Sequence, residues 1–136
     1  VRAGGGTNHR LRLDDAILIK DNHVAVAGSV SAAIEAALAN VGHLVPIEVE
    51  VDTPAQLDEV LAHADSVDAV LLDNFSIADL RAAVRRIDGT LTVETSGGIT
   101  LANVADVAAT GVDVISVGAL THSVQALDVA LDIDTR

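Results

Sequence analysis

The sequence predicts an α/β fold in which strands and helices alternate around a parallel sheet. Five short, mostly apolar runs recur along the 136 residues, as expected of strands covered on both faces. Segments with helical spacing lie between these runs. The runs end in polar or glycine residues at positions 20, 50, 73, 94 and 118, which are separated by 30, 23, 21 and 24 residues. Each step fits one strand and one helix, which implies parallel strands.

The bounds of each element are predicted from its residue types and from the residues that begin or end it. The predicted strands are 16–19, 47–51, 69–72, 91–93 and 112–117. The predicted helices are 30–38, 54–61, 77–87, 101–109 and 124–131. Each helix follows a Ser or Thr whose side chain can accept from a free backbone N–H group in the first turn. Pro54 also suits a first helical position, because its missing N–H has no partner there.

Composition excludes several classes of function. The chain has no Cys, which excludes disulfides, thiolate metal sites and cysteine nucleophiles. Phe75 is the only aromatic residue, so the stacking platforms of single-strand nucleic-acid binders are absent. Eight basic and twenty acidic residues give a formal net charge of −12, which disfavours nucleic acid and anionic membranes as partners. No apolar stretch approaches the roughly 18 residues that span a bilayer.

The number of units leaves two architectures open. Five units do not close a (β/α) barrel, which takes about 250 residues. The chain is either a self-contained doubly wound domain or the larger part of a barrel whose first strand precedes Val1. The sequence Gly-Gly-Gly-Thr-Asn-His-Arg at 4–10 is typical of an active-site loop and favours the barrel.

Three potential cations occur early in this acidic chain, namely His9, Arg10 and Lys20. Lys20 is the only lysine, and it ends an apolar run, which places its ammonium group at the edge of the sheet. An anionic ligand needs such groups, since charge-assisted hydrogen bonds contribute roughly 1.5–3 kcal/mol each. The alternative is that Lys20 ends a strand in solvent and Arg10 lies on a surface loop.

A second candidate cluster is acidic. Glu48, Glu50 and Asp52 alternate with aliphatic residues and therefore share one face of a strand. Asp73, from the next strand, is expected alongside them. In an outer strand this face is simply solvated. In a barrel it points into the lumen, where carboxylates need a cation or water, and such oxygen ligands suit Mg²⁺ or sugar hydroxyls.

Two glycine-containing loops follow the last two predicted strands. One contains Ser96, Gly97 and Gly98, and the other contains Gly118 and Ala119, with His122 nearby. Glycine lets a backbone approach a ligand, and N–H groups at a helix start bind anions. Barrel phosphate sites are frequently built after the last strands. The loops therefore indicate a phosphate site, although a tight turn also explains a single Gly-Gly pair.

Six motifs in order resemble the quinolinate phosphoribosyltransferase family over nearly the whole chain. They are the sequence at 4–10, Leu-Ile-Lys-Asp-Asn-His at 18–23, Glu-Val-Glu-Val-Asp at 48–52, Leu-Leu-Asp-Asn-Phe at 71–75, Glu-Thr-Ser-Gly-Gly-Ile at 94–99 and Ile-Ser-Val-Gly-Ala-Leu-Thr-His-Ser at 115–123. The resemblance implies an incompletely closed TIM-like α/β barrel. Residues 1–136 would form that barrel domain without its first strand and without the family's N-terminal sandwich domain, and we expect them to be inactive alone.

The resemblance also implies a reaction and its site. The family converts quinolinate and phosphoribosyl pyrophosphate to nicotinate mononucleotide, pyrophosphate and CO₂ in NAD biosynthesis, using Mg²⁺. By motif match, Lys20, Glu50 and Asp73 would be catalytic. The remaining assignments are His9, Arg10 and Lys20 at the quinolinate carboxylates, Glu50 and Asp73 at the ribose hydroxyls and the metal, and Ser96, Gly97, Gly98, Gly118, Ala119 and His122 at phosphate.

The resemblance further implies a cytoplasmic enzyme that assembles as a homodimer or a higher homo-oligomer. Two other functions remain open. One is a related transferase of the molybdenum-transport-associated type, with similar phosphate loops and another acceptor. The other is a non-catalytic module that binds phosphorylated ligands through the loops at Ser96 and Gly118.

Overall fold

The computed structural model describes residues 1–134 and contains an open five-stranded parallel sheet in the order β1-β2-β3-β4-β5. The strands are β1 (Ile17–Ile19), β2 (Ile47–Val51), β3 (Ala69–Asp73), β4 (Thr92–Ser96) and β5 (Val114–Ile115). The helices are α1 (Asp21–Ala27), α2 (Val30–Leu38), α3 (Pro54–Leu61), α4 (Ile77–Ile87), α5 (Val104–Ala108) and α6 (Ala119–His122), preceded by the 3₁₀ turn η1 (Arg2–Gly4). The predicted α/β class with parallel strand–helix repeats is confirmed.

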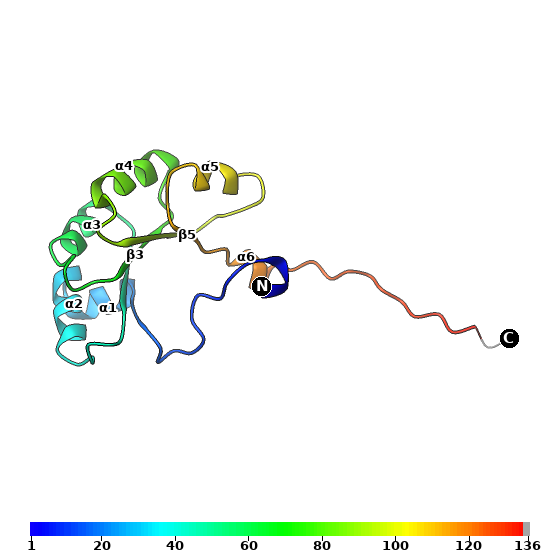
Figure 1. The fold of residues 1–136 in the computed structure, drawn as a ribbon, viewed down its shortest axis with the longest axis horizontal. Coiled ribbons are helices and arrows are strands. Elements are labelled where there is room, and N and C mark those ends of the chain that lie inside the picture. Colours follow the sequence, from blue (N-terminus) through cyan, green and yellow to red (C-terminus); the bar gives the residue numbers. More distant parts are fainter. Residues whose placement is uncertain (135–136) are drawn as a thin grey trace.

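Helices α1 to α5 form an arc along one side of the sheet, whereas the N-terminal residues and α6 lie on the other side (Figure 1). Within residues 1–134, no helix is both long enough and apolar enough to cross a membrane. The arc of helices leaves one face of the sheet uncovered by them. That face is where the candidate site lies.

The two faces of the sheet differ in chemistry because side chains alternate along each strand. The face toward the helices is aliphatic and buried. It carries Ile19, Val49, Val51, Val70, Leu72 and Val93. The opposite face, here called the polar face, carries acids and hydroxyls. Its polar side chains include Glu48, Glu50, Asp73, Glu94, Ser96 and Ser116, which the strand register and the side-chain contacts place together, with Ala69 and Leu71 of β3 on the same face.

The predicted shared face of the acidic run is found for Glu48 and Glu50 but not for Asp52. Glu48 and Glu50 are half-buried on the polar face, between the buried residues Ile47, Val49 and Val51. Asp52 differs, because it follows the last residue of β2 and lies exposed, with its backbone N–H donating to Gln56 of α3.

Three helix starts follow the predicted capping. The hydroxyls of Ser29, Thr53 and Ser76 accept backbone N–H groups in the first turns of α2, α3 and α4. The bounds of these three helices agree with those predicted from the sequence. Local side-chain caps therefore define where the chain enters the arc of helices.

Several predicted bounds were wrong after residue 90. The predicted strands 91–93 and 112–117 are in fact 92–96 and 114–115. The predicted helix 101–109 is shortened to α5. The reason is Asn103, whose side chain accepts from the backbone N–H of Thr100 and donates to the carbonyl of Gly98, which holds 100–103 in a turn.

The predicted helix at 124–131 is absent, and α1 was missed. Val124, Leu127 and Leu131 have helical spacing but are exposed, and no part of residues 1–134 covers them. Short isolated helices are marginal in water, so spacing alone does not form one. In α1, the backbone N–H of Lys20 donates to Nδ1 of His23 at 2.9 Å, and this capping contact begins a helix where the sequence predicted only a strand end.

Leu72→Ala should reveal how far the sheet depends on its helix-facing core. Leu72 lies on the central strand β3 and is fully buried, so the substitution leaves a cavity and should lower the free energy of unfolding by about 2–5 kcal/mol. The measurement is urea unfolding followed by circular dichroism. Leu101→Ala is the control, because Leu101 is 98% exposed and should change stability by less than about 0.5 kcal/mol. Equal losses in both variants would contradict the packing described.

Candidate functional site

The carboxyl edge of the sheet brings together four predicted site residues from four successive strands. Lys20 follows β1, Glu50 lies in β2, Asp73 ends β3 and Ser96 ends β4. Lys20 Nζ lies 2.8 Å from Glu50 Oε2. The hydroxyl of Ser96 donates to Asp73. Because parallel strands end at one edge, residues spread over almost eighty positions in the chain become neighbours.

Lys20 is held in a negative environment. Its hydrogen bond to Glu50 raises the pKa of Lys20 above its ordinary value, and the charges of Glu50, Asp21 and Asp73 raise it further. The Lys20 side chain remains 49% exposed, whereas that of Glu50 is only 14% exposed. The ammonium group therefore keeps its charge and remains open to solvent at the edge of the sheet.

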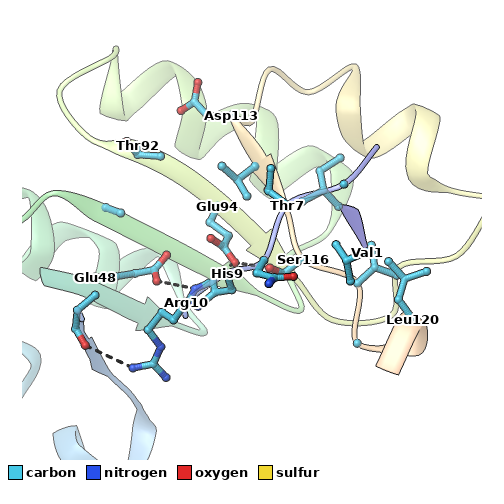
Figure 2. Close-up of a pocket in the computed structure, with 18 of the residues that line it drawn as sticks. Val1, Thr7, His9, Arg10, Glu48, Thr92, Glu94, Asp113, Ser116 and Leu120 are labelled. Carbon is cyan, nitrogen blue, oxygen red and sulfur yellow. Dashed lines mark hydrogen bonds and ion pairs between the residues drawn. The ribbon is translucent and has the colours of Figure 1, made fainter. Parts of the chain in front are cut away.

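His9 reaches the polar face from the N-terminal segment. Its Nε2 lies 2.9 Å from Glu48 Oε2 and 3.6 Å from Glu94 Oε1. The hydroxyl of Ser116 donates to Glu94. Figure 2 shows the ring of His9 between the two carboxylates, beside Ser116. Arg10 follows, and its guanidinium donates to the carbonyl of Ala16 at 3.4 Å.

A cavity of about 930 Å³ lies between the N-terminal segment and the polar face. His9 and Arg10 line it, together with Glu48 and Glu94 (Figure 2). Gly118 also belongs to the lining. The other predicted site residues lie outside its lining. They are Lys20, Glu50, Asp73, Ser96, Gly97, Gly98, Ala119 and His122. The structure therefore divides the predicted set between this cavity and the carboxyl edge beside it.

The Gly97-Gly98 turn has a definite steric cause. Both residues have positive φ, +89° at Gly97 and +62° at Gly98. A Cβ on Gly97 would lie 2.9 Å from the backbone N of Asn74 and closer still to its side-chain amide. A Cβ on Gly98 would meet nothing within 4 Å. Gly97 is thus required by the loop after β3, whereas Gly98 leaves its surroundings open to a ligand.

Gly118 has a different reason for being glycine. Its φ of −60° is ordinary, but a Cβ there would lie 3.1 Å from Nε2 of His122. His122 ends α6, and its Nδ1 lies 2.7 Å from the hydroxyl of Ser123. Glycine at 118 therefore lets the imidazole approach the backbone after β5.

Two sets of possible metal ligands can be distinguished on the polar face. Nε2 of His9 and one oxygen each from Glu48 and Glu94 lie within 4.8 Å of one another, close enough to share one metal ion. The residues predicted for a metal are Glu50 and Asp73. Asp73 accepts from Ser96 and, at 2.6 Å, from the side chain of Asn74. Both carboxylates retain free lone pairs, and their hard oxygens suit Mg²⁺.

Glu94 is the residue that sequence reasoning missed. It is 5% exposed, although it carries a carboxylate, and it lies beside the half-buried Glu48. Burial and the charge of Glu94 raise the pKa of Glu48 above its ordinary value, against the opposing effect of His9. The available signal was the alternation in β4, which places Glu94 and Ser96 on one face, as in β2.

Comparisons with known proteins agree with this geometry. Residues 1–132 match the family described as "Quinolinate phosphoribosyl transferase, C-terminal domain". The chain belongs to this family. It is 52% identical over 136 residues to the nicotinate-nucleotide pyrophosphorylase [carboxylating] of Mycobacterium leprae, covering 98% of the chain and 47% of that protein. A probable pyrophosphorylase of the same description from Bacillus subtilis is 44% identical over 133 residues, covering 98% of the chain and 45% of that protein.

Solved structures show the same family fold. The nicotinate-nucleotide pyrophosphorylase of Ehrlichia chaffeensis superposes with a TM-score of 0.90 at 42% identity, covering 96% of this chain and 47% of that one. The corresponding protein of Francisella tularensis gives a TM-score of 0.82 at 41% identity, covering 93% and 44%. The resemblance read from the six motifs is confirmed, as is the open, TIM-like α/β barrel. The chain spans about half the length of the relatives it matches.

Gly97→Ala should destabilise the domain more than Gly98→Ala. Both changes place Cβ at a positive φ, which costs about 1–2 kcal/mol. Only Gly97→Ala also drives Cβ into Asn74. The measurement is the free energy of unfolding in urea, with Gly98→Ala as the matched control. Equal losses of unfolding free energy in the two variants would show that the close approach of Asn74 does not require glycine at position 97.

Glu48→Gln should remove a pH dependence of stability. A carboxyl whose pKa is raised in the folded state binds more protons there than in the unfolded chain, so its contribution falls as pH rises above the ordinary value of 4.5. Relative to the variant, the wild-type domain should therefore lose stability between about pH 4 and neutrality. Unfolding free energies across this range test it, and Glu35→Gln, at an exposed site on α2, is the control. A constant difference between wild type and Glu48→Gln would contradict the burial described.

Proposed function

We propose that the protein carrying this domain transfers the phosphoribosyl group of phosphoribosyl pyrophosphate to quinolinate, releasing pyrophosphate and CO₂ and forming nicotinate mononucleotide for NAD biosynthesis. The family and the names of its relatives support the proposal. The observation that carries it is the gathering of Lys20, Glu50, Asp73 and Ser96 on one sheet edge, beside His9.

Quinolinate carries two carboxylates, and three cationic or potentially cationic side chains lie near the polar face to receive them. Lys20 stands at the carboxyl edge, and His9 and Arg10 line the adjoining cavity. In a chain with a formal net charge of −12, these groups make one part of the molecule suitable for an anion. Lys20 has further N–H donors beyond the one that Glu50 accepts, so it can bind a carboxylate without leaving Glu50.

The reaction needs a negative charge near the ribose. As the bond from ribose to pyrophosphate breaks, positive charge develops on the sugar, and the carboxylates of Glu50 and Asp73 stabilise it electrostatically. The quinolinate nitrogen then forms the new bond to the ribose. The resulting positive charge on the ring weakens the bond to the neighbouring carboxylate, which leaves as CO₂ while the ring carbon takes a proton. Holding two substrates together can itself lower the barrier by about 7–11 kcal/mol.

The phosphate-binding part of the proposal rests on the loops after β4 and β5. By motif match, Ser96 and the backbone around Gly98 would contact phosphate oxygens, together with Gly118, Ala119 and His122. Gly98 is exposed, and no atom lies where its side chain would be. The two loops follow neighbouring strands of the sheet, so one phosphate group can reach both.

Mg²⁺ is proposed as the cofactor, held by Glu50 and Asp73, either directly or through water. Their oxygen atoms provide the donor chemistry that Mg²⁺ prefers, and both face the same edge. When bound, the ion would offset the charge of the departing pyrophosphate. The resemblance also leads us to propose a cytoplasmic homodimer or higher homo-oligomer as the assembled form.

Lys20→Ala should impair turnover strongly. In the protein of full natural length, kcat/KM for quinolinate should fall about 10- to 150-fold, the effect of losing one charge-assisted bond, or further because Glu50 is left unpaired. Nicotinate mononucleotide formation is the measurement. Arg85→Ala removes an exposed cation on α4, away from the site, and should leave kcat/KM unchanged. An undiminished kcat/KM in Lys20→Ala would contradict the role given to this residue.

Removal of divalent metal should abolish the activity, and Asp73→Asn should raise the Mg²⁺ concentration that restores half of it. The substitution preserves size but removes the charge that attracts the ion. The matched control is Asp52→Asn, because Asp52 is exposed beyond the end of β2. Activity that persists in EDTA, or identical Mg²⁺ dependence in the two variants, would overturn this assignment.

A further inference from the structure

Two carboxylates from non-adjacent strands converge on one nitrogen of His9. Glu48 comes from β2 and Glu94 from β4, and β3 lies between them. The register places Ala69 of β3 directly beside Glu48. Leu71, the next residue of β3 on this face, lies beside Glu94, and the two carboxylates reach the ring from either side of β3, at 2.9 Å and 3.6 Å.

This arrangement brings like charges together in a poorly solvated place. The side chain of Glu48 is 13% exposed and that of Glu94 is 7% exposed. Two carboxylates so placed repel each other unless donors or a cation offset the charge. His9 supplies a donor to Glu48, and Ser116 supplies one to Glu94. The acid pair, Glu48 and Glu94, is therefore stable only with its partners in place.

The contact bears on which atom of His9 is available. With Glu48 ionised, the carboxylate can only accept, and the 2.9 Å contact then carries hydrogen on Nε2. Nδ1 is then the ring atom left for a ligand. The His9 side chain is 32% exposed and lines the cavity, so one part of the ring contacts the acid pair while another part faces open space.

A direct hydrogen bond accounts for this contact without a metal ion. The 2.9 Å between His9 Nε2 and Glu48 Oε2 is the ordinary length of a hydrogen bond from nitrogen to oxygen. The inference therefore concerns the orientation of the ring.

We propose that Glu48 and Glu94 are positioning residues for His9 and thereby set the affinity of the site for the quinolinate carboxylate. Glu48 accepts the Nε2 hydrogen and directs Nδ1 to the substrate. Glu94, anchored by Ser116, adds the second negative charge that balances a ring donating from both nitrogens in the complex. The inference deepens the proposed function and rests on it.

The kinetic test compares Glu48→Gln and Glu94→Gln in the protein of full natural length. Each variant should raise KM for quinolinate about tenfold and leave KM for phosphoribosyl pyrophosphate within twofold. Neither variant should have a further effect in a His9→Ala background, because the acid pair acts through that ring. Glu59→Gln is the matched control, since Glu59 accepts a backbone N–H from Ser31 outside the site and should change neither constant.

Equal increases in both KM values, or the same tenfold effect without His9, would overturn the proposal. Should Glu48→Gln fail to fold, Glu94→Gln carries the same test.

Nitrogen NMR of the ligand-free wild-type protein supplies an independent readout that does not need activity. We expect His9 to carry hydrogen on Nε2, and a ring protonated only on Nδ1 would overturn the proposal. Absence of nicotinate mononucleotide formation by the wild type would refute the proposed function, and the NMR result would still decide whether the acid pair orients His9.

Discussion

The pairing of each acid on the polar face with a donor is the interaction on which this site depends. Alternation along parallel strands sends aliphatic side chains to the helices and leaves carboxylates on the opposite face. Those carboxylates cannot be left unpartnered in a half-buried place. Glu48 accepts from His9, Glu50 pairs with Lys20, and Asp73 accepts from Ser96. These three partners, His9, Lys20 and Ser96, are also groups proposed to bind the substrates.

This pairing explains how a strongly acidic chain can serve anionic substrates. Lys20 is the only lysine, and the acids around it keep it charged and hold it at the carboxyl edge. In the proposed reaction, the same acids would be available to the positive charge that develops on the sugar. The carboxylates would then have two uses, to orient cations in the free protein and to stabilise the reacting ribose in the complex.

The features predicted correctly from the sequence are those that depend on residues close together in the chain. Ser29, Thr53 and Ser76 cap their helices through side chains only three residues away, so the bounds of α2, α3 and α4 were correct. The helix expected at 124–131 was wrong because its apolar residues find no partner surface. The alternation in β4 indicated the face on which Glu94 lies, but its approach to Glu48 was missed because it spans the intervening strand β3. The placement of His9 on the polar face is equally non-local.

The central claim is that the carboxyl edge and the cavity beside it form one substrate site. A crystal structure of the full-length protein with nicotinate mononucleotide bound tests it most directly. The account predicts a single nucleotide whose pyridine carboxylate contacts Lys20 or His9 and whose phosphate contacts the loop at Gly97 and Gly98. A nucleotide that touches only one of these groups, with the other facing empty solvent, would contradict it.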